Sequence, residues 1–241
     1  MGGKQQLPLI IRVDTTKSGV TPSDTFRIPT TTGETYKFKV DWGDGVVTSN
    51  HTGYAEHAYL SGGVYDIKIY GKFPRMFFNN SGDRLKLLEI LDWGDINYST
   101  NQTGAFFGCN NLTFIATDVN SWYNGITLGT QMFNGNSLTT LPAGMTLGNL
   151  TNGNSMFQNN SITSAIGLKL HKINSGSLFM NGANLPVSQY SNILVDIEAN
   201  NTNDEVIIHF GSSKYNATGQ IARDILTSAP RNWVITDGGL E

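Results

Sequence analysis

The sequence is short of charge, of basic clusters and of long apolar runs, and each shortage excludes a class of protein. Charged residues make up 15% of the 241 residues, against a typical share of about 25%. Lys and Arg form no cluster, and the net charge is −3, which argues against nucleic acid or an anionic membrane as the partner. No apolar run approaches the roughly 18 residues of a membrane span. We therefore expect no nucleic-acid partner and no membrane insertion.

Cysteine is almost absent, and an amino-terminal signal is not recognisable. The single Cys109 excludes an intramolecular disulfide framework. The first six residues lack the apolar core of a secretory signal, so a complete chain would reach the outside as a component of a phage particle does. Neutral Asn, Thr, Ser and Gly supply the polarity instead. Such a surface has many hydrogen-bonding groups and only a weak long-range electrostatic field.

The first eighty residues alternate between apolar and polar side chains. Alternation with a period of two is typical of half-buried strands. This alternation is found in residues 9–13, 36–42 and 65–69. Turn-forming Gly, Pro and Asp separate these segments at the spacing of an antiparallel sandwich, at 22–24, 32–34, 43–45 and 61–63. The pattern predicts a β-sandwich over residues 1–82 that folds on its own.

Three segments of this region also carry a family resemblance. Residues 40–45 read Val-Asp-Trp-Gly-Asp-Gly, residues 57–59 read His-Ala-Tyr, and residues 63–69 read Gly-Val-Tyr-Asp-Ile-Lys-Ile. In this order and at this spacing they resemble a PKD-type domain. The resemblance implies an immunoglobulin-like sandwich of seven strands, of the kind that serves as a spacer or a carbohydrate-proximal module on extracellular proteins.

The acids and histidines of these segments have two interpretations. Asp41 and Asp44 suggest a calcium site or an acid/base pair, and His51 and His57 suggest metal ligands. Two acids without a third oxygen-rich partner make a poor Ca²⁺ shell, and no Cys or carboxylate lies at ligand spacing from the histidines. We therefore favour turn chemistry for the acids, a loop or packing role for the histidines, and no metal or other cofactor.

An internal repeat begins after residue 85. Phe107, Phe133, Phe157 and Phe179 follow one another at intervals of 26, 24 and 22 residues, and leucine-rich solenoids repeat at about 20–29. Each Phe precedes an Asn-rich segment and then an apolar residue. We expect each repeat to bury one of these Phe rings, to satisfy freed backbone groups with Asn side chains, and to begin a short strand at the apolar residue.

The repeats resemble those of BspA-like leucine-rich-repeat surface proteins. The resemblance is carried by residues 106–113, Phe-Phe-Gly-Cys-Asn-Asn-Leu-Thr, and by the Met-Phe blocks that follow. In such proteins a PKD-type module often precedes the solenoid. This chain departs from the pattern because its later repeats shorten and because the Asp-x-Ser segment usual before a Met-Phe block is missing. The resemblance implies a leucine-rich-repeat-type solenoid over residues 83–187.

The candidate binding residues are those that do not recur from one repeat to the next. Aromatic side chains flanked by amides suit stacking on sugar rings together with hydrogen bonding to hydroxyl groups. The alternative is that the aromatic residues belong to the core, where most Trp side chains lie. The candidates are Trp93, Asn97 and Tyr98 in the first repeat, and Trp122, Tyr123 and Asn124 in the second.

The last part of the chain, residues 188–241, has more regular patterning. It predicts helix, strand, helix and strand in that order, at 188–197, 206–210, 221–226 and 233–235. An open solenoid needs its last apolar face covered, so we expect an α/β cap. Residues 190–197, 209–211 and 233–239 resemble the terminal module of surface and phage tail-fibre proteins with such repeats. The chain ends two residues after Gly239, which suggests a true carboxyl terminus, and in tail fibres this end is the receptor-facing tip.

The predicted fold class is thus mainly β with short helices: an immunoglobulin-like sandwich, a leucine-rich-repeat-type solenoid and an α/β cap. Three functions compete, namely a receptor-binding or adhesion protein, an architectural spacer and a glycan-active enzyme. A glycosidase needs two carboxylates at a defined separation, and no motif of another catalytic chemistry is present. We therefore predict a protein without enzymatic activity.

Within the binding class the predicted protein is a phage tail-fibre component that binds a bacterial cell-surface receptor, either a glycan or a protein. Absence of a signal favours the phage origin, and a bacterial leucine-rich-repeat adhesin or a structural spacer of the virion is the alternative. The predicted location is the virion tail surface or the outside of a cell. Other virion or cell-surface proteins are expected as partners, and self-association into a homo-oligomer stays open.

Overall fold

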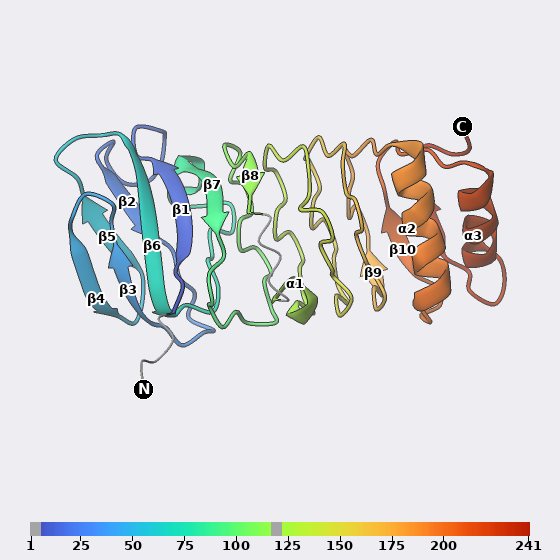
Figure 1. The fold of residues 1–241 in the computed structure, drawn as a ribbon, viewed down its shortest axis with the longest axis horizontal. Coiled ribbons are helices and arrows are strands. Elements are labelled where there is room, and N and C mark those ends of the chain that lie inside the picture. Colours follow the sequence, from blue (N-terminus) through green and yellow to red (C-terminus); the bar gives the residue numbers. More distant parts are fainter. Residues whose placement is uncertain (1–5, 117–121) are drawn as a thin grey trace.

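The molecule is elongated and consists of three regions along one axis (Figure 1). A computed structural model describes residues 6–116 and 122–241. Sheets of six, three and two strands account for the regular structure, with few short helices. The prediction of a mainly β protein with short helices is confirmed. Within the described residues no helix is both long enough and apolar enough to cross a membrane.

The amino-terminal region contains a six-stranded sheet and a two-stranded sheet. The larger sheet has the order β4-β3-β6-β1-β7-β8, antiparallel except for the parallel pair β7 and β8. The smaller sheet pairs β2 with β5. The strands are β1 (Leu9–Asp14), β2 (Thr25–Ile28), β3 (Lys37–Asp41), β4 (Val47–His51), β5 (Ala55–Ala58), β6 (Val64–Lys72), β7 (Leu87–Asp92) and β8 (Phe114–Ile115).

Burial along these strands follows the alternation of the sequence. In β3, Phe38 and Val40 are buried, whereas Lys37 and Lys39 are exposed. Alternate residues of a strand point to opposite faces of its sheet, so one face of β3 lies against the core and the other faces solvent. Trp42, the next residue after β3, is fully buried. The predicted half-buried strands are confirmed in this region.

The six-stranded sheet continues past residue 82, where the sandwich was predicted to end. Strand β7 pairs antiparallel with β1, with Ile11 opposite Ile90. A 3-10 turn, η1 (Arg84–Lys86), lies just before β7. The predicted segments 1–82 and 83–187 therefore share one sheet.

A buried ion pair joins the same two segments. Lys86 and Asp83 have fully buried side chains whose nearest charged atoms are 3.9 Å apart. The Lys86 ammonium group donates to the carbonyl oxygens of Pro22 at 2.7 Å and Thr25 at 2.8 Å. The Asp83 carboxylate accepts the Arg27 N–H at 2.8 Å. Residues that follow position 82 thus hold the loop between β1 and β2 in place.

Residues 100–116 and 122–183 form a stack of chain turns that we call the coil stack. Parallel bridges join Asn101 to Leu128, Leu128 to Asn152 and Asn152 to Ser175. The column continues through a three-stranded parallel sheet in the order β11-β10-β9. The elements are α1 (Trp122–Gly125), β9 (Ser175–Gly176), β10 (Ile207–His209) and β11 (Val234–Thr236). Each coil therefore pairs with the coils before and after it.

Each coil contains a pair of residues in the left-handed region, four positions apart, and the first member of each pair defines which residues of the coils are equivalent. The pairs lie on tight turns. Gly adopts the left-handed region without strain, whereas Gln131, Ser155 and Leu178 adopt it at a cost in free energy. The first members have φ values of 55° to 67°. The pairs are Gly104 and Gly108, Gln131 and Gly135, Ser155 and Asn159, and Leu178 and Gly182.

The register set by these turns corrects the predicted alignment in two coils. The position two residues after the first left-handed residue is Phe106 in the first coil, and Phe107 is only partly buried. The prediction that Phe107 fills the core is wrong. In the fourth coil the equivalent position is held by Met180, and Phe179 is one residue earlier. Phe133, Phe157 and Phe179 are fully buried, as predicted.

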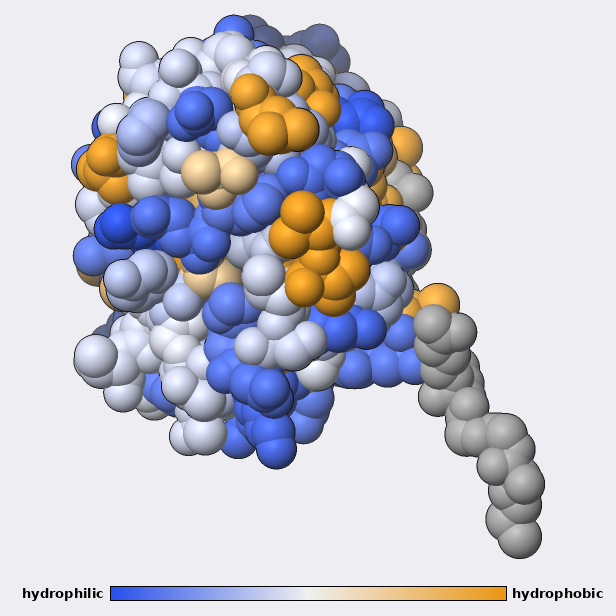
Figure 2. All heavy atoms as spheres, turned by 90° about the vertical axis from the view of Figure 1, so that its left-hand side faces the viewer, coloured by the Kyte–Doolittle hydropathy of each residue, from blue (hydrophilic) through white to orange (hydrophobic). Residues whose placement is uncertain are grey.

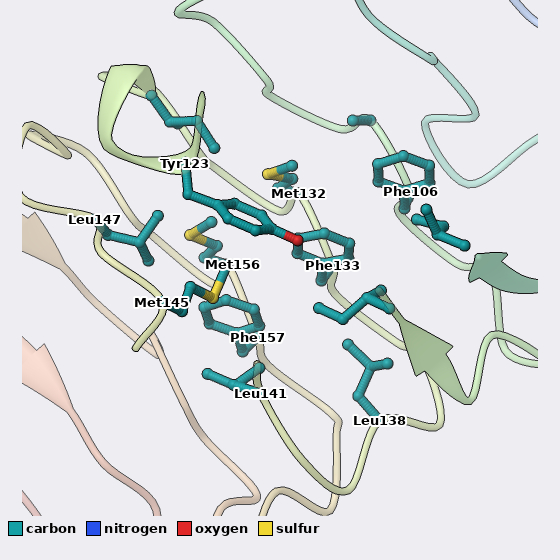
Figure 3. Packing of buried hydrophobic residues seen from close by; sticks show 14 of the residues in the cluster. Phe106, Tyr123, Met132, Phe133, Leu138, Leu141, Met145, Leu147, Met156 and Phe157 are labelled. Carbon is teal, nitrogen blue, oxygen red and sulfur yellow. The ribbon is translucent and has the colours of Figure 1, made fainter. Parts of the chain in front are cut away.

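The aromatic rings of the coil stack lie one above another in the core (Figure 3). Phe106 and Phe133 have ring centroids 5.2 Å apart with planes 6° from parallel, and Phe133 and Phe157 are 5.6 Å apart and 5° from parallel. The next pair, Phe157 and Phe179, meets edge to face at 84°. The change from stacked to edge-on packing coincides with the one-residue shift of the fourth coil.

Buried asparagines satisfy the backbone between coils. The Asn160 amide donates to the carbonyl oxygens of Phe133 at 2.7 Å and Phe157 at 3.0 Å, and its own oxygen accepts the Leu138 N–H at 3.1 Å. Asn136 donates to the carbonyl oxygens of Phe106 and Cys109 in the preceding coil, each at 3.0 Å. The predicted pairing of Asn side chains with freed backbone groups is confirmed at these positions.

Two helices follow the coil stack, α2 (Val187–Asn200) and α3 (Ala217–Thr227). Together with β10 and β11 they give the predicted order of helix, strand, helix and strand. Tyr190 and Leu194 of α2 are fully buried. Asn216 caps α3 by accepting the N–H groups of Thr218 and Gly219. The helices lie at the far end of the molecule from the six-stranded sheet (Figure 1).

The opposite end of the molecule shows small, separate apolar patches between hydrophilic residues (Figure 2). Val46, Val47 and Leu60 are among the exposed large apolar residues of the amino-terminal region. Scattered apolar groups of this kind are normal on a protein surface. This end therefore gives no specific indication of a partner.

Candidate functional site

The fold brings together the four aromatic residues that the sequence proposed as binding residues. Ring centroids are 4.7 Å apart for Trp93 and Trp122, 4.4 Å for Tyr98 and Trp122, and 4.4 Å for Trp122 and Tyr123. The contacts join two consecutive turns of the chain. The aromatic cluster therefore exists only because the two turns lie side by side.

The four aromatic residues differ in exposure. Trp93 and Tyr123 are 0% exposed, so the prediction that they offer exposed rings is wrong. Figure 3 shows Tyr123 pointing from α1 into the core towards Met132 and Phe133. Tyr98 and Trp122 are partly buried and pack against this core. We call Tyr98 and Trp122 the aromatic pair.

The aromatic pair is held in a fixed position by its surroundings. The Tyr98 hydroxyl donates to the Trp93 carbonyl oxygen at 2.7 Å, and the Trp122 ring rests on the buried rings of Trp93 and Tyr123. A ring that is already fixed loses little conformational freedom when it binds a ligand. The arrangement suits ring stacking with a planar or flat-faced partner.

Both predicted amide side chains lie on the surface, and each is close in sequence to one residue of the aromatic pair. Asn97 and Asn124 are exposed, and they flank Tyr98 and Trp122 along the chain. The Asn124 carbonyl oxygen accepts the Asn149 side-chain N–H at 2.9 Å, which ties α1 to the next coil. Amide groups next to partly exposed rings are able to donate to and accept from hydroxyl groups.

Three polar side chains and one glycine form a row that extends from α1 across the following coils to α2, and sequence analysis missed it. A Cβ atom at Gly148 would lie 2.6 Å from the Asn124 side-chain oxygen and 3.9 Å from His171 Nδ1. His171 Nε2 is 3.1 Å from Asp196 Oδ2 on α2. We call these four residues the corner row. Each comes from a different turn of the chain, so their sequence spacing carries no signal that would group them.

The acids of the β3–β4 turn bond to their own turn. Asp41 accepts the Gly43 N–H at 3.1 Å and Asp44 accepts the Val46 N–H at 3.0 Å, which is the predicted turn chemistry. His57 Nε2 lies 2.7 Å from Asp44 Oδ2. Burial acts to raise the pKa of Asp44, but the hydrogen bonds from His57 and Val46 outweigh it, and the pKa is lowered.

The two histidines of this region pack against aromatic rings. The His57 ring stacks on Trp42 with centroids 5.1 Å apart, and the His51 ring lies 5.1 Å from that of Phe38. Burial lowers the pKa of His51. Across residues 6–116 and 122–241, no three side chains of His, Cys, Asp and Glu gather in a way that would hold a metal ion.

Known proteins give no guide to this site. Comparison of the chain with protein families, with curated proteins and with solved structures found no match. The aromatic pair, the exposed amides and the corner row are therefore interpreted from their own geometry and chemistry.

Proposed function

We propose that this chain is a non-enzymatic surface recognition protein that binds a glycan on a bacterial cell, as the receptor-binding component of a phage tail fibre. The observation that carries the proposal is the aromatic pair, whose rings are partly exposed yet fixed on the buried rings of Trp93 and Tyr123. Sugars present flat apolar faces edged by hydroxyl groups, and they stack on such rings.

The proposed fold is an immunoglobulin-like, PKD-type sandwich followed by a leucine-rich-repeat-type solenoid and its α/β cap. The parallel bridges between turns 23 to 27 residues apart support the solenoid, for example those of Asn101 with Leu128 and Asn152 with Ser175. Two sheets around a shared core support the sandwich. The proposed location is the virion tail surface or the outside of a cell.

The elongated outline of the molecule favours a second candidate, an architectural spacer (Figure 1). The two amino-terminal sheets, several coils and the helices α2 and α3 follow one axis, and one hydrophobic cluster includes residues from all three regions. A spacer needs such a continuous body and needs no binding surface. The two functions differ in a single respect that an experiment measures, which is whether the isolated chain binds cells.

The test is pull-down of bacterial cells with the chain presented in many copies, because single shallow sites are weak and multivalency raises their avidity. Trp122→Ala removes half of the aromatic pair, and we expect it to reduce cell binding strongly. Phe114→Ala is the control, since Phe114 is an exposed aromatic residue that lies outside the pair. Tyr123→Ala is unsuitable because Tyr123 belongs to the core.

Cell binding at low and high salt concentration distinguishes this proposal from binding through ion pairs. Hydrogen bonding and ring stacking are little affected by ionic strength, whereas exposed ion pairs are screened. We expect similar binding at low and high salt. Equal cell binding by Trp122→Ala and the unchanged chain, or binding that disappears at high salt, would contradict the proposal.

A further inference from the structure

A small cavity of about 100 Å³ lies where the coil stack meets α2. Ile166 and Ile193 give it an apolar side. Ile193 is 3% exposed and belongs to the core, whereas Ile166 is 55% exposed at the rim. An apolar floor with an open rim accepts a small apolar group, such as a methyl group, that remains attached to a larger ligand outside.

Gln189 supplies an oriented hydrogen-bond donor at this cavity. Its side-chain oxygen accepts the backbone N–H of Ala165 at 2.9 Å. Because a backbone N–H can only donate, the bond identifies the oxygen of the amide and assigns the two N–H donors to Nε2. Gln189 lines the cavity, so the cavity combines apolar walls with an amide, held by the Ala165 N–H, whose Nε2 is able to donate hydrogen bonds.

The charged groups at the rim neutralise one another. Lys169 and Asp196 both line the cavity and form an ion pair. Asp196 also contacts His171 at 3.1 Å. A paired carboxylate and ammonium group give little net attraction to either a cation or an anion. The chemistry of the cavity therefore favours a neutral group that has a carbonyl oxygen beside a methyl group.

The corner row leads from the cavity to α1, the helix that also carries Trp122 of the aromatic pair. It runs from Asn124 of α1 past Gly148 to His171, and His171 contacts Asp196 at the rim of the cavity. Neighbouring parallel segments lie about 4.8 Å apart, so the row crosses a distance of a few sugar rings. A side chain at Gly148 would meet the Asn124 oxygen, and glycine leaves this part of the row free of obstruction.

We propose that the cavity binds the acetyl group of an acetylated sugar, within the same glycan that stacks on the aromatic pair. The methyl group packs between Ile166 and Ile193, and the carbonyl oxygen accepts a hydrogen bond from Gln189 Nε2. N-acetyl and O-acetyl groups share this chemistry. The inference rests on the proposed glycan-binding function, because the aromatic pair supplies the rest of the contact.

The test uses titration calorimetry with the full chain and neutral oligosaccharides of equal length. The probes are β-1,4-linked N-acetylglucosamine oligomers and the corresponding glucose oligomers, which carry a hydroxyl in place of the acetamido group. One well-placed group in a pocket changes affinity by about tenfold or more, so we expect the acetylated oligomer to bind at least about tenfold more tightly. An O-acetylated oligosaccharide, before and after mild removal of its acetyl groups, distinguishes the two sources of acetyl.

Gln189→Glu is the diagnostic variant. A carboxylate still accepts the Ala165 N–H but has no N–H to donate, so the preference for the acetylated oligomer should fall to about one while thermal stability changes little. Gln220→Glu makes the same substitution on α3, away from the cavity, and should keep the preference.

The outcomes separate this inference from the proposed function. Equal affinity for acetylated and non-acetylated oligomers, no affinity for any acetylated probe, or an unchanged preference in Gln189→Glu overturns the acetyl assignment. The proposed function survives any of these results if Trp122→Ala still loses cell binding, and it fails if that variant binds cells normally.

Discussion

The amino-terminal region with strands β1 to β8, which we call the amino-terminal module, shares one hydrophobic cluster with the coil stack. The two regions are nevertheless held together by different kinds of pairing. In the module, strands far apart in sequence pair antiparallel, as β1 does with β6. Its solvent face carries cross-strand ion pairs, such as Arg12 with Asp66 and with Glu89. In the coil stack, each turn contacts the next one in sequence through backbone bridges, buried amides and stacked rings.

The difference shows that the two regions need different parts of the chain in order to be stable. A coil cannot bury its ring without neighbours, so stability in the stack builds up from one coil to the next. The module instead needs a defined set of strands, and one of them, β7, comes from beyond residue 82. The two regions therefore share strand β7 at their boundary.

The largest expected effect comes from cutting the chain at that boundary. A fragment of residues 1–82 lacks β7 and the buried pair of Asp83 and Lys86, which holds the β1–β2 loop. We expect this fragment to be largely disordered, contrary to the sequence-based prediction, and a fragment of residues 1–92 to be the more folded of the two. Amide NMR spectra of both measure this. A well-dispersed spectrum for residues 1–82 would show that the module is complete without β7.

The next effect concerns which Phe of the first coil fills the core. Phe106 is 2% exposed and stacks on Phe133, whereas Phe107 is only partly buried. Phe106→Ala should cost about 3–5 kcal/mol of unfolding free energy, the usual loss for a core Phe, and Phe107→Ala clearly less. Denaturant unfolding of both variants compares them. A larger loss for Phe107→Ala would reverse the register of the coil.

The smallest effect is expected on the charged face of the module. Arg12 bonds to both Asp66 and Glu89, but its side chain is 39% exposed, and solvent-exposed ion pairs contribute at most about 1 kcal/mol. Arg12→Gln should lower stability by no more than that amount, and the difference should shrink in high salt. Thermal unfolding at two salt concentrations checks it. A loss of several kcal/mol would mean that this pairing, and not the core, holds the sheet together.

The sequence by itself determined the features that depend on local periodicity. Alternation of apolar and polar residues fixed the mainly β class and the strands around Phe38 and Val40, because neighbouring side chains of a strand face opposite ways. The recurring Phe and Asn residues predicted stacked turns with amides that satisfy the backbone. Asp41 and Asp44 were recognised as turn residues because their bonds lie within two positions of each acid.

Tertiary structure alone decided the features that depend on which way a side chain points and on contacts between residues far apart in sequence. Phe106 and Phe107 are chemically identical, and the left-handed turn beginning at Gly104 decides which of them points inward. Burial separated Trp93 and Tyr123 from the partly buried aromatic pair, because the exposure of a ring is set by the coils that pack on either side of it. The pairing of β7 with β1 and the grouping of the corner row have the same origin. Residues from separate turns meet only when the backbone stacks, and their spacing in the chain does not record that meeting.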